Sequence, residues 1–288
     1  MPKQNIIVKY TDDNSFSQLL IEQKISNNFI ITKLLVKIMK LFKYCIKFGE
    51  YSLPHRTSLF EAIKIISSGK VVIYKITIPE GFSIIQVMRR LQKHENLLGE
   101  IEQTPLEGSL LPDTYCYKYP TKKQDIIFRA QKAMQKFILQ EWPKRSPTCT
   151  LKNINDAITL ASIIEKETSI EREMIAGVYL HRLKINMKLQ SCPTVIYAIR
   201  KGEKLGRKLK YSDLTVNDPY NTYIHYGLPP TPINNPGRES IIAVLHPQET
   251  ENLFFVFIGE GKHIFSKTYE EHKRNIAEIR NIDVSKAL

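Results

Sequence analysis

Five prolines fall within residues 218–237, whose sequence is DPYNTYIHYGLPPTPINNPG. Proline lacks a backbone N–H and fixes φ, so this segment can be neither a helix interior nor a central strand. The segment is rich in Tyr and Asn rather than in Ser, Gln or Glu, which argues against disorder. The sequence therefore predicts a long, ordered, irregular loop.

The composition of this loop suggests a ligand. Tyrosine offers an apolar ring with a polar tip, and an asparagine amide can both donate and accept hydrogen bonds, so a rigid wall of the two suits a sugar. An ordered loop that only covers the core is the open alternative. The candidate sugar-binding residues of the loop are Tyr220, Asn221, Thr222, Tyr223 and Asn235.

A predicted helix within residues 158–182 carries two acids that face different ways. At about 100° per residue, Glu167 lies within roughly 20° to 60° of the apolar residues Leu160, Ile163 and Ile164. Glu165 points about 140° away from Leu160. Burial disfavours the charged form and raises the pKa of a carboxyl group, which suits a general acid near neutral pH. We expect Glu167 to be that acid, with a snorkelling or ion-paired side chain as the ordinary alternative.

The net charge indicates a negatively charged partner, and the cysteine and histidine spacings argue against a metal site. The formal net charge of +13 favours a polyanionic neighbour such as nucleic acid, an anionic membrane surface or acidic wall polymer. The four cysteines form no CxxC and the seven histidines no HExxH, so we predict no metal and no cofactor. Asp12 and Asp13 stand where a signal peptide needs apolar residues, and no segment reaches the roughly 18 apolar residues of a membrane span.

A lysine stripe marks residues 29–48, FIITKLLVKIMKLFKYCIKF. Its lysines recur every three or four residues, which places them along one face of an otherwise apolar helix. Such a helix can contact an anionic membrane surface. The commoner alternative is a core helix with a solvated lysine face.

Local signals predict a mixed α+β chain. Ser58 to Glu61 and Ser83 to Gln86 form capping boxes that open two helices, with a strand between them. Irregular sequence after residue 94 suggests a boundary between an N-terminal region, 1–95, and a larger, mostly helical α+β domain, 96–288. The irregular stretch LEGSLLPDTYCY offers Glu107 and Tyr115 as ligand-contacting residues, or forms a structured linker.

Five motifs follow one another along the chain: LEGSLLPDTY, LASIIEKET, LHRLKINMKLQSCPTVIY, YNTYIHYGLPPTPINNPG and HIFSKTYEEH. In this order and spacing they resemble the YceG-like family of endolytic murein transglycosylases. The resemblance implies a lyase that cuts nascent peptidoglycan strands internally between N-acetylmuramic acid (MurNAc) and N-acetylglucosamine (GlcNAc), leaving 1,6-anhydro-MurNAc ends. It implies the periplasmic face of the cell inner membrane and allows peptidoglycan synthases as partners. It also implies a LysM-like module, matched by residues 49–93.

The resemblance places the essential acid at Glu167, the second acid of EKE. One glutamate would protonate the glycosidic oxygen and then, as carboxylate, take the proton from the C6 hydroxyl of MurNAc. We expect Gln190 and Thr194 to bind sugar together with the loop residues named above. Three features depart from the family pattern: Cys192 replaces an expected Asp, His181 replaces an expected Asn, and the N-terminal anchor is absent from this chain.

Three other functions compete with this one. A peptidoglycan-binding scaffold of the elongation machinery would keep the fold and lose catalysis, which Cys192 favours and Glu167 opposes. A hydrolytic muramidase would need a second acid, for which Glu107, Asp113 and Glu165 are candidates. A nucleic-acid binder is disfavoured because the tyrosines cluster with prolines and asparagines rather than with basic residues.

Overall fold

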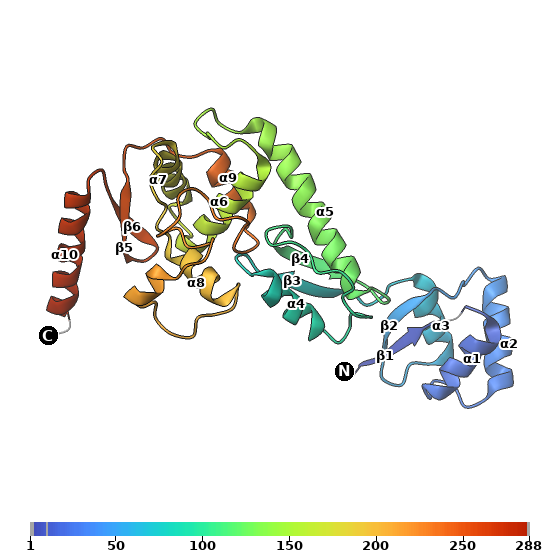
Figure 1. Cartoon of the computed structure of the whole chain (residues 1–288). Coiled ribbons are helices and arrows are strands. Elements are labelled where there is room, and N and C mark those ends of the chain that lie inside the picture. Colours follow the sequence, from blue (N-terminus) through green and yellow to red (C-terminus); the bar gives the residue numbers. More distant parts are fainter. Residues whose placement is uncertain (1–2, 10, 287–288) are drawn as a thin grey trace. The chain divides into compact units, whose positions relative to one another are not determined.

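The computed structural model describes residues 3–9 and 11–286 and forms two compact units. The first comprises Met1–Ile76, His94–Glu100 and Thr114–Lys123, and the second comprises Thr77–Lys93, Ile101–Asp113 and Gln124–Leu288. Helices and small two-stranded sheets alternate along the chain (Figure 1), which confirms the predicted α+β class. Among the described residues, no helix combines the length and apolar character needed to cross a membrane.

The first unit packs three helices beside a two-stranded sheet. Strands β1 (Lys3–Val8) and β2 (Gly49–Pro54) run antiparallel, with Ile6 opposite Tyr51. Helices α1 (Asp13–Glu22), α2 (Phe29–Leu41) and α3 (Leu59–Ser68) bury Phe16, Val36 and Ile63 in one core. The predicted capping box of α3 is confirmed, since Ser58 and Glu61 bond reciprocally, and Gly69 ends the helix in a left-handed conformation.

One expectation for the N-terminal part needs correction. The expected long helix over residues 29–48 ends at Leu41, and the backbone turns through a left-handed residue at Lys43. The expected LysM-like module over residues 49–93 stays a prediction; within this stretch the residues up to Ile76 belong to the first unit and Thr77–Lys93 belong to the second. The division at residue 95 stays a prediction.

Strands β3 (Tyr74–Ile78) and β4 (Asp113–Tyr117) pair in a second small sheet. Helix α4 (Ile84–Gln92) follows β3 and begins with the predicted capping box of Ser83 and Gln86. The other regular elements of the chain follow in order: α5 (Lys123–Glu141), η1 (Trp142–Lys144), α6 (Ile154–Glu167), α7 (Arg172–Lys184), α8 (Cys192–Arg200), η2 (Tyr211–Thr215), α9 (Arg238–Leu245), β5 (Phe254–Gly259), β6 (Lys262–Ser266) and α10 (Tyr269–Lys286).

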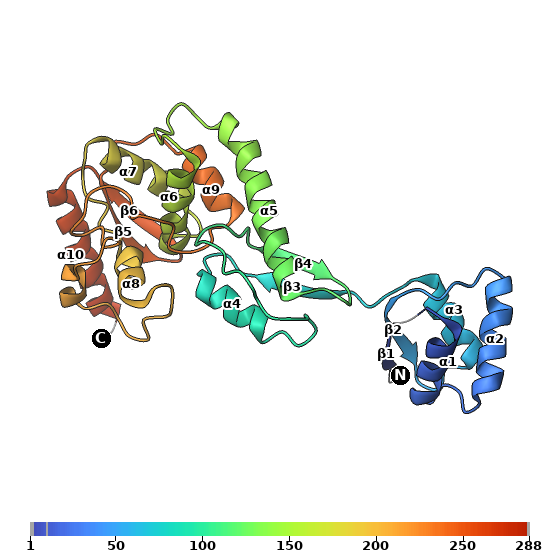
Figure 2. The same cartoon turned by 45° about the vertical axis from the view of Figure 1, so that its right-hand side comes forward.

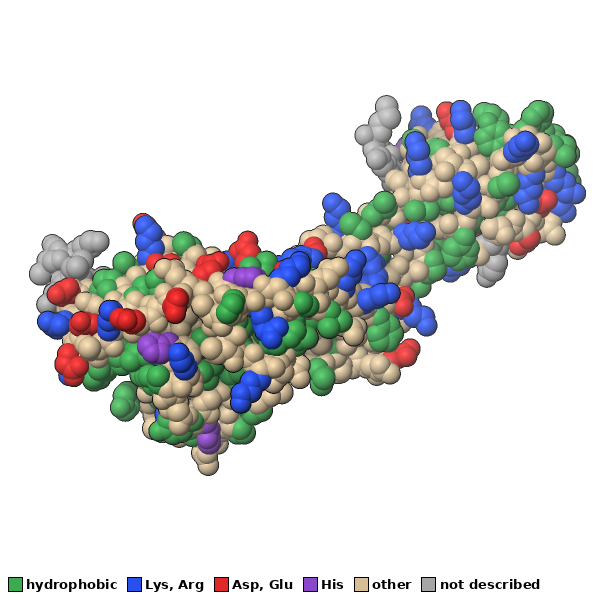
Figure 3. Space-filling model, turned by 90° about the horizontal axis from the view of Figure 1, so that it is seen from above, with side chains coloured by type: hydrophobic (Ala, Val, Ile, Leu, Met, Phe, Trp, Pro, Cys, Tyr) green, Lys and Arg blue, Asp and Glu red, His purple; other side chains and the backbone are tan. Residues whose placement is uncertain are grey.

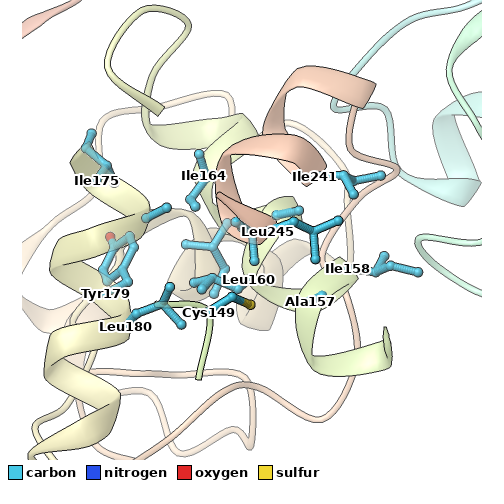
Figure 4. Packing of buried hydrophobic residues seen from close by; sticks show 14 of the residues in the cluster. Cys149, Ala157, Ile158, Leu160, Ile164, Ile175, Tyr179, Leu180, Ile241 and Leu245 are labelled. Atoms are coloured by element: carbon cyan, nitrogen blue, oxygen red, sulfur yellow. The ribbon is translucent and has the colours of Figure 1, made fainter. Parts of the chain in front are cut away.

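Helix α6 is the central element of the second unit. It packs against α7 and α9, as both cartoon views show (Figure 1; Figure 2). Every residue from Ala157 to Ile164 is buried, and Leu160, Tyr179 and Leu245 meet in the core between the three helices (Figure 4). Because these residues are buried, Glu167 at the C-terminal end of α6 lies beside an apolar core.

The proline-rich segment lies between η2 and α9 and is ordered without forming a helix or strand, as predicted. Its buried polar groups bond to the body of the unit. The N–H of Ile233 donates to Ser162 Oγ at 3.0 Å, and the Asn234 amide donates to the Ser162 carbonyl at 2.6 Å. These bonds fasten the loop to the middle of α6.

Candidate active site

Glu167 is the last residue of α6, and one of its carboxyl oxygens is held by two hydroxyl groups. Tyr179 Oη donates to Oε1 at 2.8 Å, and Ser191 Oγ donates to the same Oε1 at 2.5 Å. Within the described part of the chain, Oε2 of Glu167 accepts no hydrogen bond. The carboxyl group is therefore fixed through one oxygen, and the other can carry a proton.

The surroundings of Glu167 raise its pKa. Burial is the largest cause, and it outweighs the hydrogen bonds from Ser191 and Tyr179 and the electrostatic influence of His263 and Arg182, all of which lower the pKa. Desolvation disfavours the anion, so the acid keeps its proton to higher pH than an exposed glutamate does. This is the protonation behaviour that a general acid requires.

Helix α7 supplies two residues that the sequence analysis missed. Tyr179 is 1% exposed, and burial raises its pKa well above the usual value, so it remains a donor. Arg182, three residues later on the same face, is buried and donates from Nε to the Leu253 carbonyl and from Nη1 to the Leu189 carbonyl, both at 2.6 Å. Arg182 thus anchors the chain just before Ser191.

Ser191 is positioned by two predicted residues, Thr194 and Thr222. The N–H of Ser191 donates to Thr222 Oγ1 at 3.0 Å, Thr194 Oγ1 donates to the Ser191 carbonyl at 2.7 Å, and the two threonine hydroxyls lie 2.8 Å apart. Both threonines are fully buried. They support the hydroxyl that holds Glu167, and their polar groups do not face solvent. Gln190 is exposed beside them, with a left-handed φ of 50°.

Cys192 occupies the position where an acid was expected. Its Sγ lies 3.2 Å from Tyr223 Oη. Burial raises the pKa of this thiol above its usual value, so the group is neutral at neutral pH. Residue 192 therefore offers no carboxylate. Its thiol, at the start of α8, is instead the hydrogen-bond partner of the Tyr223 hydroxyl group.

The two predicted loop asparagines are structural in this fold. Asn221 is fully buried and donates to the carbonyls of Leu214 and Val216 at 2.9 and 2.8 Å. Asn235 is also fully buried; it donates to the Phe82 carbonyl at 2.8 Å and accepts from the Leu110 N–H at 2.9 Å. These bonds shape the loop, whereas Tyr220 and Tyr223 are partly exposed.

Tyr220 and Tyr197 form an aromatic pair with ring centroids 4.8 Å apart. Tyr197 Oη lies 3.3 Å from Oε2 of Glu107, whose Oε1 accepts from the Ile84 N–H at 2.8 Å. Burial raises the pKa of Glu107 to about 7. A pocket of about 330 Å³ is lined by Tyr197 and by Lys166, the residue before Glu167.

The remaining predicted residues have other environments. Tyr115 lies on β4, is buried and belongs to the first unit. Oε2 of Glu165 accepts from the Gly237 N–H at 3.0 Å and from Ser240 Oγ at 2.7 Å, at the start of α9. Asp113 forms an exposed ion pair with Arg238 at 3.0 Å. In the described residues, no group of three or more His, Cys, Asp or Glu could hold a metal ion.

Comparison with known proteins decides the family. The model of the YceG-like family matches residues 7–278. This chain belongs to the YceG-like family. The prediction made from the five motifs is thereby confirmed.

Two relatives and one solved structure agree with this placement of the YceG-like chain. An endolytic murein transglycosylase of Bacillus subtilis (strain 168) is 30% identical over 281 residues, covering 83% of this chain and 77% of the relative. One of Streptococcus pneumoniae (strain D39) is 29% identical over 288 residues, covering 82% of this chain and 51% of the relative. A yceG-like protein from Listeria monocytogenes, known from a crystal structure, is 31% identical in sequence. The alignment covers 95% of this chain and 99% of the Listeria chain, with a TM-score of 0.57. The relatives confirm the predicted enzyme class, a transglycosylase.

Proposed function

We propose that this YceG-like protein is an endolytic lytic transglycosylase that cleaves nascent murein between MurNAc and GlcNAc, with Glu167 as its single acid and base. One observation carries the proposal. Glu167 has a raised pKa, one oxygen held by Tyr179 and Ser191, and a second oxygen without a hydrogen bond in the described chain. Such a carboxyl group keeps its proton to higher pH than an exposed glutamate and is held in one orientation, and both properties favour proton transfer to a bound glycan.

The reaction would proceed in two proton transfers. Glu167 first gives its proton to the glycosidic oxygen, the bond from that oxygen to C1 of MurNAc breaks, and GlcNAc leaves with a free hydroxyl group. The C6 hydroxyl of the same MurNAc then bonds to C1 and loses its proton to the Glu167 carboxylate. The product is a 1,6-anhydro end, the acid is regenerated and no water is consumed.

The carboxylate formed in the first step is stabilised by groups already in place. Hydrogen bonds from Tyr179 and Ser191 and the electrostatic influence of Arg182 and His263 all favour the ionised form of Glu167. They do not overcome the effect of burial in the resting state. They would reduce the cost of the anion at the moment it forms, which is the preorganised electrostatic stabilisation that enzymes use.

The surroundings of the other acids support a mechanism with one carboxylate. Glu165 is bound to the start of α9, and Asp113 is paired with Arg238. Glu107 bonds to Tyr197 and to the start of α4. A hydrolytic glycosidase needs a second free carboxylate as nucleophile or base, and each of these three already has partners.

We further propose that the glycan strand lies along the partly exposed side chains of Gln190, Tyr220 and Tyr223. The pair of Tyr220 and Tyr197 offers an aromatic surface beside the 330 Å³ pocket, and sugar rings pack their apolar faces on such surfaces. Location at the periplasmic face of the membrane, a LysM-like character of the N-terminal part and peptidoglycan synthases as partners belong to the same proposal. They rest on the resemblance to the family.

The test is mass spectrometry of fragments released from uncrosslinked murein by the native chain and by Glu167→Gln. We expect internal fragments lighter by one water than hydrolytic products from the native chain and none from the variant. Hydrolytic products from the native chain would instead indicate a muramidase. Retained murein binding without products from either protein would favour the scaffold function, with Cys192→Asp as the variant to test for restored cleavage.

A further inference from the structure

Helix α2 has two apolar faces, and the core uses only one of them. Its buried residues are Thr32, Val36 and Met39, which face the core of the first unit. At about 100° per residue, five large aliphatic residues fall in an arc of roughly 100° centred opposite Val36. These are Ile30 (77% exposed), Ile31 (60%), Leu34 (58%), Ile38 (40%) and Leu41 (83%). We call these five residues the outer face of α2.

This arrangement is unlike that of an ordinary surface helix, which has polar residues opposite its buried stripe. Single exposed apolar residues are common on soluble proteins, but a contiguous apolar patch usually marks an interaction site. Phe42, which follows the helix, is also 71% exposed and lengthens the patch. The sequence analysis expected either a helix lying on an anionic membrane surface or a core helix with a lysine face, and α2 combines a core face with an exposed apolar one.

Lysines flank the outer face. Lys33, Lys37 and Lys40 lie roughly 40° to 100° from Val36, all on the same side of the helix. Lys40 pairs with Asp13, whereas Lys33 and Lys37 have no ion pair among the described residues. Helix α2 contains no acid. Hydrophobic and Lys or Arg side chains lie next to each other on the surface of the first unit (Figure 3).

We propose that the outer face of α2 lies on an anionic lipid bilayer, with the helix parallel to the membrane plane. Aliphatic residues enter the headgroup and acyl boundary, while flanking lysines extend their stems and keep the ammonium groups at the anionic surface. A helix of 13 residues is about 20 Å long and cannot cross a hydrocarbon core of about 30 Å. Contact along the surface is the orientation that covers all five aliphatic residues.

A second copy of the chain fits this face less well than a bilayer does. Pairing two outer faces would bring together lysines of both copies, and α2 offers no acid to neutralise them. An anionic bilayer offers an apolar region to the aliphatic residues of the outer face and negative headgroups to the flanking lysines. The proposal is independent of the catalytic role of Glu167 and deepens the proposed location at the membrane.

The experiment is flotation of the full chain with vesicles rich in phosphatidylglycerol and, separately, with phosphatidylcholine vesicles. We expect binding to the anionic vesicles that weakens with salt, and weaker binding to the neutral ones. The triple variant Ile30→Gln, Leu34→Gln and Leu41→Gln should lower the partition coefficient by roughly tenfold or more. All three positions are exposed, so the fold should persist.

The matched control is Leu139→Gln, which changes an aliphatic residue on α5 that is about as exposed as Leu34 (55% against 58%) and should leave the partition coefficient unchanged. Lys33→Glu with Lys37→Glu should weaken binding to anionic vesicles only. The proposal is overturned if the native chain does not float with anionic vesicles, or if the triple variant floats as well as the native chain. A triple variant that instead abolishes self-association in sedimentation would assign the face to a second copy.

Discussion

The hydroxyl group of Tyr179 lies 2.8 Å from Oε1 of Glu167, across the junction of α7 with the end of α6. Tyr179 is buried, and its own pKa is raised well above the usual value, so its hydroxyl donates throughout the working pH range. Ser191 donates to the same oxygen from the start of α8. The acidity of Glu167 is thus set by the packing of three helices, and this dependence can be tested.

Tyr179→Phe should move the pH dependence of the reaction. The Tyr179 hydroxyl lowers the pKa of Glu167, so its loss raises that pKa further above the usual value. A donor with a higher pKa stays protonated to higher pH, and the alkaline limb of kcat/KM against pH should move to higher pH. The control is Tyr211→Phe, at an 87% exposed position, which should leave the profile in place. An unshifted alkaline limb in Tyr179→Phe would contradict this role.

Ser191→Ala should reduce the rate while preserving the fold. Ser191 stands at the N-cap of α8, but its side chain does not cap the helix and donates to Glu167 instead. Loss of a hydrogen bond to a charged group costs about 1.5–3 kcal/mol, so kcat should fall by roughly tenfold to a hundredfold. Thermal unfolding should change little. A large fall in Tm with normal kcat would show that the hydroxyl is structural only.

Glu165→Ala should reduce stability while preserving activity, the reverse of the result expected for Ser191→Ala. Oε2 of Glu165 accepts from the Gly237 N–H and from Ser240 Oγ, so the substitution leaves two donors at the start of α9 without this acceptor. We expect a loss of roughly 1–3 kcal/mol in the free energy of unfolding. Activity per folded molecule should persist, as measured after correction for the folded fraction. If activity disappears while stability is kept, Glu165 is a second catalytic acid.

The paired acids show how much of this site could be predicted from the sequence. Helical periodicity separated Glu165 from Glu167, and the two side chains indeed have different partners. Capping boxes at Ser58 and Ser83 were predictable because they depend on residues three apart. Such features need only local geometry.

Contacts between distant segments were not predictable in this way. Tyr179 is one of the buried residues of α7, and from the sequence it cannot be told from an ordinary core aromatic residue. Only the structure shows that its hydroxyl group donates to Glu167. Asn221 and Asn235 match the composition of a sugar site, but burial turns their amides toward backbone carbonyls. The second apolar face of α2 was hidden as well, because a sequence rich in aliphatic residues does not reveal which of them the core covers.

Glu107 should make the stability of the second unit depend on pH. Its pKa is raised by burial from 4.5 to about 7 in the folded chain. The folded state therefore binds the proton more tightly than the unfolded state, and the free energy of unfolding should fall as pH rises from about 4.5 to 7. The fall should be on the order of 1–3 kcal/mol.

The measurement for Glu107 is denaturant unfolding at several pH values for the native chain and for Glu107→Gln. The variant cannot ionise at this position, so its stability should decline less over the same pH range. Parallel curves for the two proteins would contradict the raised pKa of Glu107.

Isotope labelling can show whether Glu167 alone cleaves the strand without water. The native chain would act on uncrosslinked murein in water enriched in the heavy oxygen isotope, with mass analysis of every new MurNAc end. We expect anhydro ends that carry no heavy oxygen, because the C6 hydroxyl of MurNAc would be the nucleophile. One heavy oxygen atom per new end would show that water attacks C1, and Glu167 would then act with a second carboxylate.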